Sequence, residues 1–330
     1  MPRSAILFTG PWTDLPLEEI AGLASEWGYQ GLDLATWGDH CEVQRILGED
    51  DHCSARLDLL RQLELELPVI SCHRLSQLIA DNIDGRHRAL VPDYVWGDGK
   101  PTGVRERATQ EMIATIQAAQ KLGASTVAGF TGSPIWSFVG GYPSPSREVV
   151  SEGFREVVHH WTPILEVCAD LGIRYAFEVH PGQIAFDLVS AEMLLDAMGG
   201  REEFGFTFDP THLFWQGIDP VEFLRRFPDR IYHVHVKDVA ITLNGRTGLL
   251  GSYLPYADPR RGWSPRCPGR GGLDWEAIIR ALNSIGYTGA LAVEWSDPGM
   301  DRSFGAEEAR RFLQRLDFPS PPSPDEPAFR

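Results

Sequence analysis

Four side chains that can bind a metal lie at the ends of apolar, strand-like runs in the second half of the chain. They are Glu178 in YAFEVHPG, Asp209 in FGFTFDPTH, His235 in IYHVHVKD and Glu294 in ALAVEWSD. Three carboxylates and one imidazole suit Mn²⁺, Mg²⁺, Co²⁺ or Zn²⁺ and leave positions open for substrate oxygens. A charged group in an apolar run is costly unless it is paired or bound to a metal. We therefore predict one divalent ion on these four residues, with Mn²⁺ as the first choice.

The alternation of side chains along each strand supports this convergence. Glu178 shares a strand face with His180, and His235 shares one with Lys237, whereas the intervening Val179 and other neighbours are apolar. In a parallel barrel the C-terminal ends of neighbouring strands meet at one rim. The four ligands should therefore meet at one point.

The elements that must position these residues follow one repeated pattern. Short apolar runs alternate with helical stretches, which is typical of βα units and a parallel sheet. Helical patterns over 16–27, 105–122, 152–171 and 275–285 are each followed by or end near a glycine, as an αβ turn requires. The eight expected strands are 5–8, 31–34, 69–72, 126–130, 174–179, 204–208, 231–236 and 290–294. We predict an α/β protein, a (β/α)₈ TIM barrel over residues 1–317.

Two connections are too long to be simple turns. Residues 73–103 follow the third strand and residues 238–274 follow the seventh. In a barrel, loops after strands lie at the catalytic face, so both should shape the pocket. The last stretch, 318–330, is rich in Pro and Ser and is predicted to be a mobile tail.

Composition excludes several classes of partner. Thirty basic and 46 acidic side chains give a net charge of −16, which repels nucleic acid and anionic lipid. No segment reaches the roughly 18 apolar residues that cross a bilayer. The five cysteines form no C-x-x-C pair, which argues against disulfides and structural zinc. We expect a cytoplasmic enzyme that acts on a small molecule.

As a set, the motifs E-x-H, D-P-T-H, H-x-H-x-K-D and V-E-W resemble those of the xylose-isomerase-like barrel superfamily, in the sugar phosphate isomerase/epimerase branch. The resemblance covers roughly residues 4–316. It implies that Glu178, Asp209, His235 and Glu294 are the metal ligands and that the two glutamates are the catalytic acid/base pair. It also implies that His212 binds a substrate hydroxyl near the metal; the structural alternative is a histidine that caps the next helix.

The chemistry of these groups agrees with the resemblance. A metal bound to a carbonyl oxygen and an adjacent hydroxyl acidifies the C–H between them and stabilises an enediolate. A carboxylate with a pKa of about 4.3 is ionised at pH 7 and can remove that proton. We predict a divalent-metal-dependent sugar isomerase or epimerase.

Five further residues are candidates for substrate binding, each with a structural alternative. They are His180 and His73 (or satisfied core histidines), Lys237 (or an ion pair with Asp238), Trp37 (or loop packing) and Arg270 in the run PGRGG (or a flexible loop). A tryptophan ring packs well on the C–H face of a sugar. An arginine and backbone amides in a glycine-rich loop can bind an anionic or hydroxylated group.

Three other functions remain open. The first is a metal-dependent lyase that cleaves 3-oxo-(C-)glycosides by β-elimination, because the chain is also similar to the larger subunit of such enzymes. That resemblance implies a small partner subunit. A homo-oligomer is the other possible assembly. The second, an apurinic-site endonuclease, needs a basic DNA-binding face, which the charge of −16 disfavours. The third is a sugar-binding barrel without catalysis, which would not need two glutamates around a metal.

Overall fold

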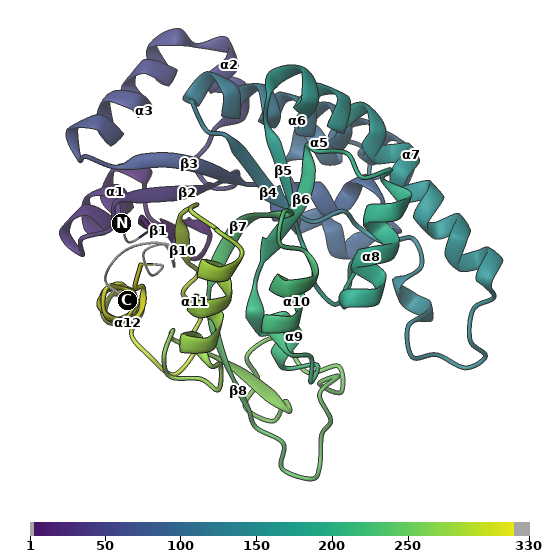
Figure 1. Cartoon of the computed structure of the whole chain (residues 1–330). Helices are drawn as coiled ribbons and strands as arrows, with labels where there is room; N and C mark the ends of the chain where they lie inside the picture. Colours follow the sequence, from purple (N-terminus) through teal and green to yellow (C-terminus); the bar gives the residue numbers. More distant parts are fainter. Residues whose placement is uncertain (1–2, 320–330) are drawn as a thin grey trace, which may run out of the picture.

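Eight parallel strands close into a barrel in the computed structural model, which describes residues 3–319 (Figure 1). The order around the barrel is β1-β10-β7-β6-β5-β4-β3-β2. The strands are β1 (Ala5–Phe8), β2 (Gly31–Ala35), β3 (Glu66–Ser71), β4 (Thr126–Gly129), β5 (Arg174–Glu178), β6 (Phe204–Phe208), β7 (Ile231–Val236) and β10 (Leu291–Val293). The predicted (β/α)₈ fold is confirmed, and each expected strand is present within a few residues.

Helices cover the outside of the barrel and return the chain from each strand to the next (Figure 1). They are α1 (Leu17–Glu26), α2 (Val43–Gly48), α3 (Asp50–Gln62), α6 (Pro101–Leu122), α7 (Arg147–Leu171), α8 (Leu188–Ala197), α9 (Pro210–Phe214), α10 (Pro220–Arg226), α11 (Trp275–Ser284) and α12 (Arg302–Leu316). The long helices α6 and α7 end at Gly123 and Gly172, which adopt the left-handed conformation with φ of 80° and 67°.

Both helices begin earlier than predicted, α6 by four residues and α7 by five. Pro101 opens α6, where its fixed φ suits the first helical position and its missing N–H costs nothing. The side chain of Ser146 accepts a hydrogen bond from the Val149 amide and caps α7. These local start signals extend each helix beyond its apolar pattern.

Long connections lie beside the C-terminal ends of the strands. The segment after β3 holds α4 (His73–Ser76), α5 (Asp93–Trp96), and two short 3₁₀ turns, η2 (Gln77–Ile79) and η3 (Gly85–Leu90). The segment after β7 holds an antiparallel pair, β8 (Asp238–Ile241) and β9 (Trp263–Arg266). Figure 1 shows the loop of this pair projecting from the barrel. Both predicted long loops are present, and a third, 130–146 before α7, was not predicted.

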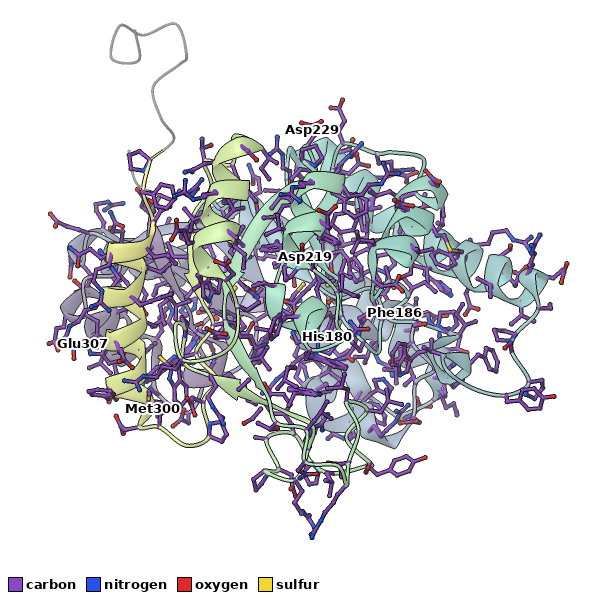
Figure 2. The ribbon with its side chains drawn as sticks, turned by 60° about the horizontal axis from the view of Figure 1, so that its bottom comes forward. His180, Phe186, Asp219, Asp229, Met300 and Glu307 are labelled. Carbon is purple, nitrogen blue, oxygen red and sulfur yellow. The ribbon has the colours of Figure 1, made fainter. Side chains whose placement is uncertain are left out.

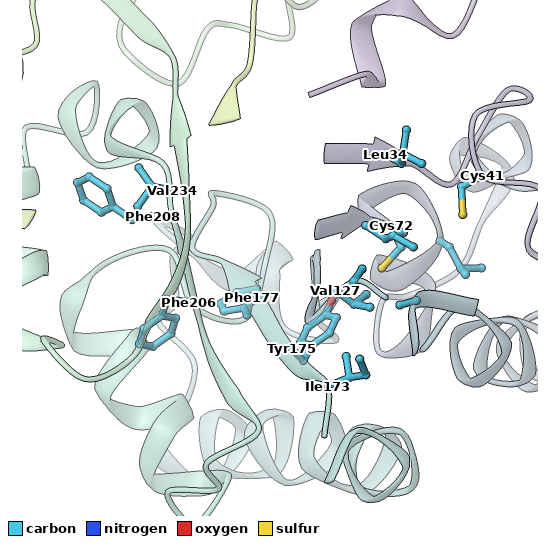
Figure 3. Close-up of a cluster of buried hydrophobic side chains, with 14 of the residues drawn as sticks. Leu34, Cys41, Cys72, Val127, Ile173, Tyr175, Phe177, Phe206, Phe208 and Val234 are labelled. Carbon is cyan, nitrogen blue, oxygen red and sulfur yellow. The ribbon is translucent and has the colours of Figure 1, made fainter. Parts of the chain in front are cut away.

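The hydrophobic core lies mainly between the barrel and the helices. Outward-facing side chains of the strands, including Tyr175, Phe177 and Phe206, are fully buried against helices (Figure 3). Inside the barrel, Val69, Ala128 and Ala176 form a small separate cluster. Because small apolar side chains fill this part of the interior, the polar inward-facing residues gather nearer the strand ends.

Three sequence expectations bear on the rest of the chain. All five cysteines are buried and free. Within residues 3–319, no helix is both long enough and apolar enough to cross a membrane. Of the predicted tail, residues 320–330 lie outside the described part, whereas the Phe318 carbonyl accepts a hydrogen bond of 3.1 Å from the Asn283 side chain.

Candidate active site

Glu178, Asp209, His235 and Glu294 meet at the C-terminal ends of β5, β6, β7 and β10, where their ligand atoms lie within 4.8 Å of one another. Nδ1 of His235 lies 3.1 Å from Glu178 Oε2 and 3.0 Å from Glu294 Oε2. His235 Nδ1 and Asp209 Oδ2 are buried, and among the described residues neither makes a hydrogen bond with good geometry, although ionisable groups lie within 3.1 Å of each. Buried acceptors without a well-directed donor are costly, and a cation between them would satisfy both. This donor set fits a divalent metal.

The start of α9 orients Asp209. Its Oδ1 accepts hydrogen bonds from the amide and the hydroxyl of Thr211 at 2.8 and 2.6 Å, so Asp209 is the N-cap of this helix. Pro210 occupies the first helical position. The sequence D-P-T therefore fixes one carboxylate oxygen on the helix and leaves Oδ2 directed at the other ligands.

Lys237 lies between two of the four ligand carboxylates. Its Nζ is 2.6 Å from Glu294 Oε1 and 3.5 Å from Asp209 Oδ2. Burial alone would lower the pKa of Lys237, but the charges of Glu294 and Asp209 hold it well above the ordinary value. The ammonium is therefore charged and fixes the position of Glu294.

Three imidazoles surround Glu178. His73 Nε2 lies 3.0 Å from Glu178 Oε2, and His212 Nε2 lies 3.3 Å from Oε1 and 3.1 Å from Asp209 Oδ2. The ring of His180 packs against that of His212 with 4.0 Å between centroids. His180 is labelled in Figure 2, near the middle of the barrel and away from Glu307 on α12.

The charges of this cluster attract cations. Burial alone would raise the pKa of Glu178, but the adjacent imidazoles of His212, His235 and His73 hold it well below its usual range. Burial likewise opposes the protonation of His212, but the charge of Asp209 raises its pKa to about 9. The pKa of His180 falls to about 3 because the ring is buried and faces the cationic His212. Without a metal, protons on imidazoles balance the ionised carboxylates.

A cavity of about 490 Å³ opens above these residues. It is lined by the two glutamates and by five of the six residues predicted to bind substrate, namely His212, His180, His73, Lys237 and Trp37. A volume of this order suits a small molecule such as a sugar. The structure thus brings these side chains together in one pocket.

Arg270 is not brought to this cavity. Its guanidinium is half-exposed and pairs with Glu308 on α12 at 2.6 Å. The glycine-rich run around it folds over Asp238, whose Oδ2 accepts hydrogen bonds from the Gly269 amide at 3.0 Å and the Trp275 indole at 3.2 Å. Asp238 therefore hydrogen-bonds to this loop. Lys237 pairs with Glu294 and Asp209 rather than with Asp238.

Several residues of this site were not predicted from the sequence, and three of them bear on its chemistry. Asp33 on β2 accepts hydrogen bonds from His233 at 3.0 Å and His235 at 3.4 Å. The Phe8 ring stacks on His235 with 5.4 Å between centroids. Arg74 lines the cavity next to His73. Asp33 carried a usable signal, because it is the charged residue inside the apolar run GLDLA.

Comparison with known proteins places the chain in a family. The model of the xylose isomerase-like TIM barrel family matches residues 21–316. The chain therefore belongs to this family, as its motifs predicted. The relatives and structural neighbours of this chain include proteins named as epimerases and dehydratases.

Two relatives differ in how much of the chain they match. Uncharacterized protein YfiH of Bacillus subtilis is 22% identical over 321 residues, which cover 91% of this chain and 95% of YfiH. Inosose dehydratase of Geobacillus kaustophilus is 27% identical over 161 residues, which cover 46% of this chain and 48% of the dehydratase. The second match therefore spans about half of that enzyme.

Two solved structures share the fold along nearly the whole chain. The 3-keto-D-glucoside 4-epimerase YcjR from E. coli superposes with a TM-score of 0.68 at 14% identity, covering 95% of this chain and 99% of YcjR. The IolI protein, which has a bound zinc atom, superposes with a TM-score of 0.63 at 17% identity, covering 95% and 97%. At these identities the likeness establishes the fold.

Proposed function

We propose that this protein is a divalent-metal-dependent isomerase or epimerase of a sugar-like substrate. One observation carries the proposal: Glu178 and Glu294 each place a carboxylate oxygen 3.0 to 3.1 Å from Nδ1 of His235, and both side chains line the cavity. Two carboxylates beside one metal site can remove a proton from carbon and return it.

Glu178, Asp209, His235 and Glu294 would hold the ion. Mn²⁺ is our first choice because three of the four ligands are carboxylates, and the zinc in IolI supports a divalent ion in this fold. When bound, the ion would supply positive charge that makes the C–H group next to a substrate carbonyl more acidic.

Two glutamates of the site would carry out the proton transfers. Glu178 and Glu294 are the base and its counterpart. Return of the proton to the adjacent carbon, together with transfer of the hydroxyl proton to the former carbonyl oxygen, isomerises the sugar. Return of the proton to the opposite face of the same carbon epimerises it. Lys237 holds Glu294 through Oε1, while His73 and His212 hold Glu178. This leaves the two carboxylates little freedom to move between the transfers.

His180 has a separate role in this scheme. Its ring is neutral because the pKa is low, and Nδ1 donates to the Pro181 carbonyl. Nε2 is then an acceptor for a substrate hydroxyl at the cavity wall. Trp37 offers an aromatic face to the C–H groups of the same substrate.

The second candidate is a lyase that eliminates a group β to a ketone, such as the aglycone of a 3-oxo-(C-)glycoside. Two observations favour it: inosose dehydratase is among the relatives, and three imidazoles, those of His73, His180 and His212, line the cavity. For this function His73 or His212 would be the acid, because His180 is neutral and donates its proton to Pro181. A small partner subunit would complete the enzyme.

Proton NMR in D₂O tests the proposal. The Mn²⁺-loaded protein is incubated with ketohexoses and, separately, with 3-oxo-glucosides. We expect deuterium at the carbon next to the carbonyl of a recovered ketose, together with its isomer or epimer, because the abstracted proton exchanges with solvent. Release of aglycone with no change in any ketose would favour the lyase, and no exchange in any substrate would contradict both.

A further inference from the structure

Arg74 lies where two cavities meet. It lines the 490 Å³ cavity of the site and a second cavity of about 440 Å³ between α2, α5 and α6. Trp37 lines both cavities as well, and the guanidinium carbon of Arg74 lies 4.8 Å from the Trp37 ring centroid. Trp37 is held by a hydrogen bond of 3.3 Å to the Gly10 carbonyl and by an edge contact with Phe8. The arginine therefore rests on an anchored aromatic face.

The guanidinium of Arg74 has no hydrogen-bond or ion-pair partner within residues 3–319. Arg74 is exposed to solvent, partial desolvation lowers its pKa, and no neighbouring carboxylate acts against this effect. By contrast, Lys237 in the same cavity is paired with Glu294, and Arg88, which also lies over a tryptophan ring, is paired with Asp93. In a chain with 46 acidic residues, an unpaired arginine at a cavity wall is available for a ligand.

We propose that Arg74 binds an anionic oxygen group of the substrate, a carboxylate or a phosphate, at the end away from the reacting carbons. A guanidinium presents parallel N–H groups that match the paired oxygens of either anion. Stacking on Trp37 leaves the edge of the guanidinium free to donate. This inference rests on the proposed function, because it assigns a substrate class to the same cavity.

The position of Arg74 fits the far end of a bound sugar. The preceding residue, His73, contacts Glu178 at the candidate reaction centre, so one peptide unit joins that centre to the rim. The anion would lie beside Arg74 rather than among the carboxylates of the metal site, which would repel it. Glu42 and Glu111 line the second cavity, so the anion belongs on the side of Arg74 that faces the site. The substrate is therefore an acidic ketose or a ketose phosphate.

Three ligands with one carbon skeleton test this inference: D-fructose, D-fructose 6-phosphate and D-fructuronate, which differ in the group at C6. Their dissociation constants for the Mn²⁺-loaded protein are measured by calorimetry at low ionic strength, where charge pairing is least screened. We expect at least one anionic ligand to bind about tenfold or more tightly than D-fructose, since hydrogen bonds between charged groups are the strong ones. The preferred anion identifies the group.

Two variants attribute this preference to Arg74. R74Q removes the charge and should bring the three constants to within about twofold of one another, whereas R88Q, which removes a stacked but paired arginine outside the cavity, should preserve the wild-type preference. Circular dichroism confirms that both variants fold. Equal affinities in the wild type, including no binding at all, or a preference that survives in R74Q would overturn the inference. If a neutral ketose exchanges its proton with D₂O but the protein binds anionic ligands no more tightly, the proposed function stands and the inference about Arg74 fails. If the protein prefers anionic ligands but no substrate exchanges a proton, the proposed function alone is contradicted.

Discussion

Asp33 Oδ2 lies 3.4 Å from Nε2 of His235, whereas Nδ1 of the same ring faces Glu178 and Glu294. The same oxygen accepts a hydrogen bond of 3.0 Å from His233. Burial alone would raise the pKa of Asp33, but the hydrogen bonds from His233 and His235 keep it below its usual range. An ionised Asp33 favours the proton on Nε2 of His235 and leaves the Nδ1 lone pair for a metal.

The substitution D33N should therefore weaken metal binding. The amide carries no charge to favour the required tautomer of His235, and loss of such an outer contact typically reduces metal affinity by about 10- to 100-fold. Competition with a fluorescent chelator measures the affinity for Mn²⁺. The control D238N alters a buried carboxylate that serves the glycine-rich loop, and it should keep the wild-type affinity. Equal affinities for D33N and wild type would remove Asp33 from this role.

The proximity of Glu178, Asp209, His235 and Glu294 could be predicted because each ends a strand pattern and parallel strands share one rim. Their role as metal ligands stays a prediction. Asp33 could not be placed in the same way, because it lies inside β2 rather than at its end, and its partners His233 and His235 lie on β7.

The orientation of the glycine-rich loop could not be predicted from the sequence. The run PGRGG indicates a flexible backbone, but it does not indicate where the backbone amides and the Arg270 side chain point. Its amides bind Asp238, and the side chain of Arg270 pairs with Glu308 on α12. Conversely, Arg74 stands in a helical turn with no motif around it, and only the packing against Trp37 shows that it faces a cavity.

A second prediction concerns catalysis by Glu294. In E294Q the amide cannot accept a proton from carbon, so turnover should fall by about 100-fold or more. Metal content is measured on the same samples, because glutamine is also a poorer ligand. E276Q, which changes a glutamate on the surface of α11, should leave turnover unchanged. An E294Q protein that holds metal and keeps a near-wild-type rate would exclude Glu294 as the base.

A third prediction concerns the buried ammonium of Lys237. K237M leaves Glu294 and Asp209 without their cation, and loss of one partner of a buried pair commonly costs about 3 to 5 kcal/mol. The metal-free variant should unfold at lower urea concentration than metal-free wild type, and added Mn²⁺ should recover part of the difference because it supplies positive charge at the same carboxylates. K121M, which breaks an exposed pair with Asp50, should have no measurable effect. A deficit that Mn²⁺ does not change would contradict the shared electrostatic role.

The metal itself allows the most direct test of the central claim. Protein purified without added metal is analysed by inductively coupled plasma mass spectrometry, then stripped with EDTA and titrated with Mn²⁺, Mg²⁺, Co²⁺ and Zn²⁺ by calorimetry. The double variant D209N/H235Q removes two of the four candidate ligands, those whose facing atoms make no well-directed hydrogen bond among the described residues. We predict one divalent ion per wild-type chain, none in the double variant, and loss of turnover on chelation that a divalent ion restores. Wild-type protein that binds none of the four ions, and whose activity chelation does not affect, would contradict the account.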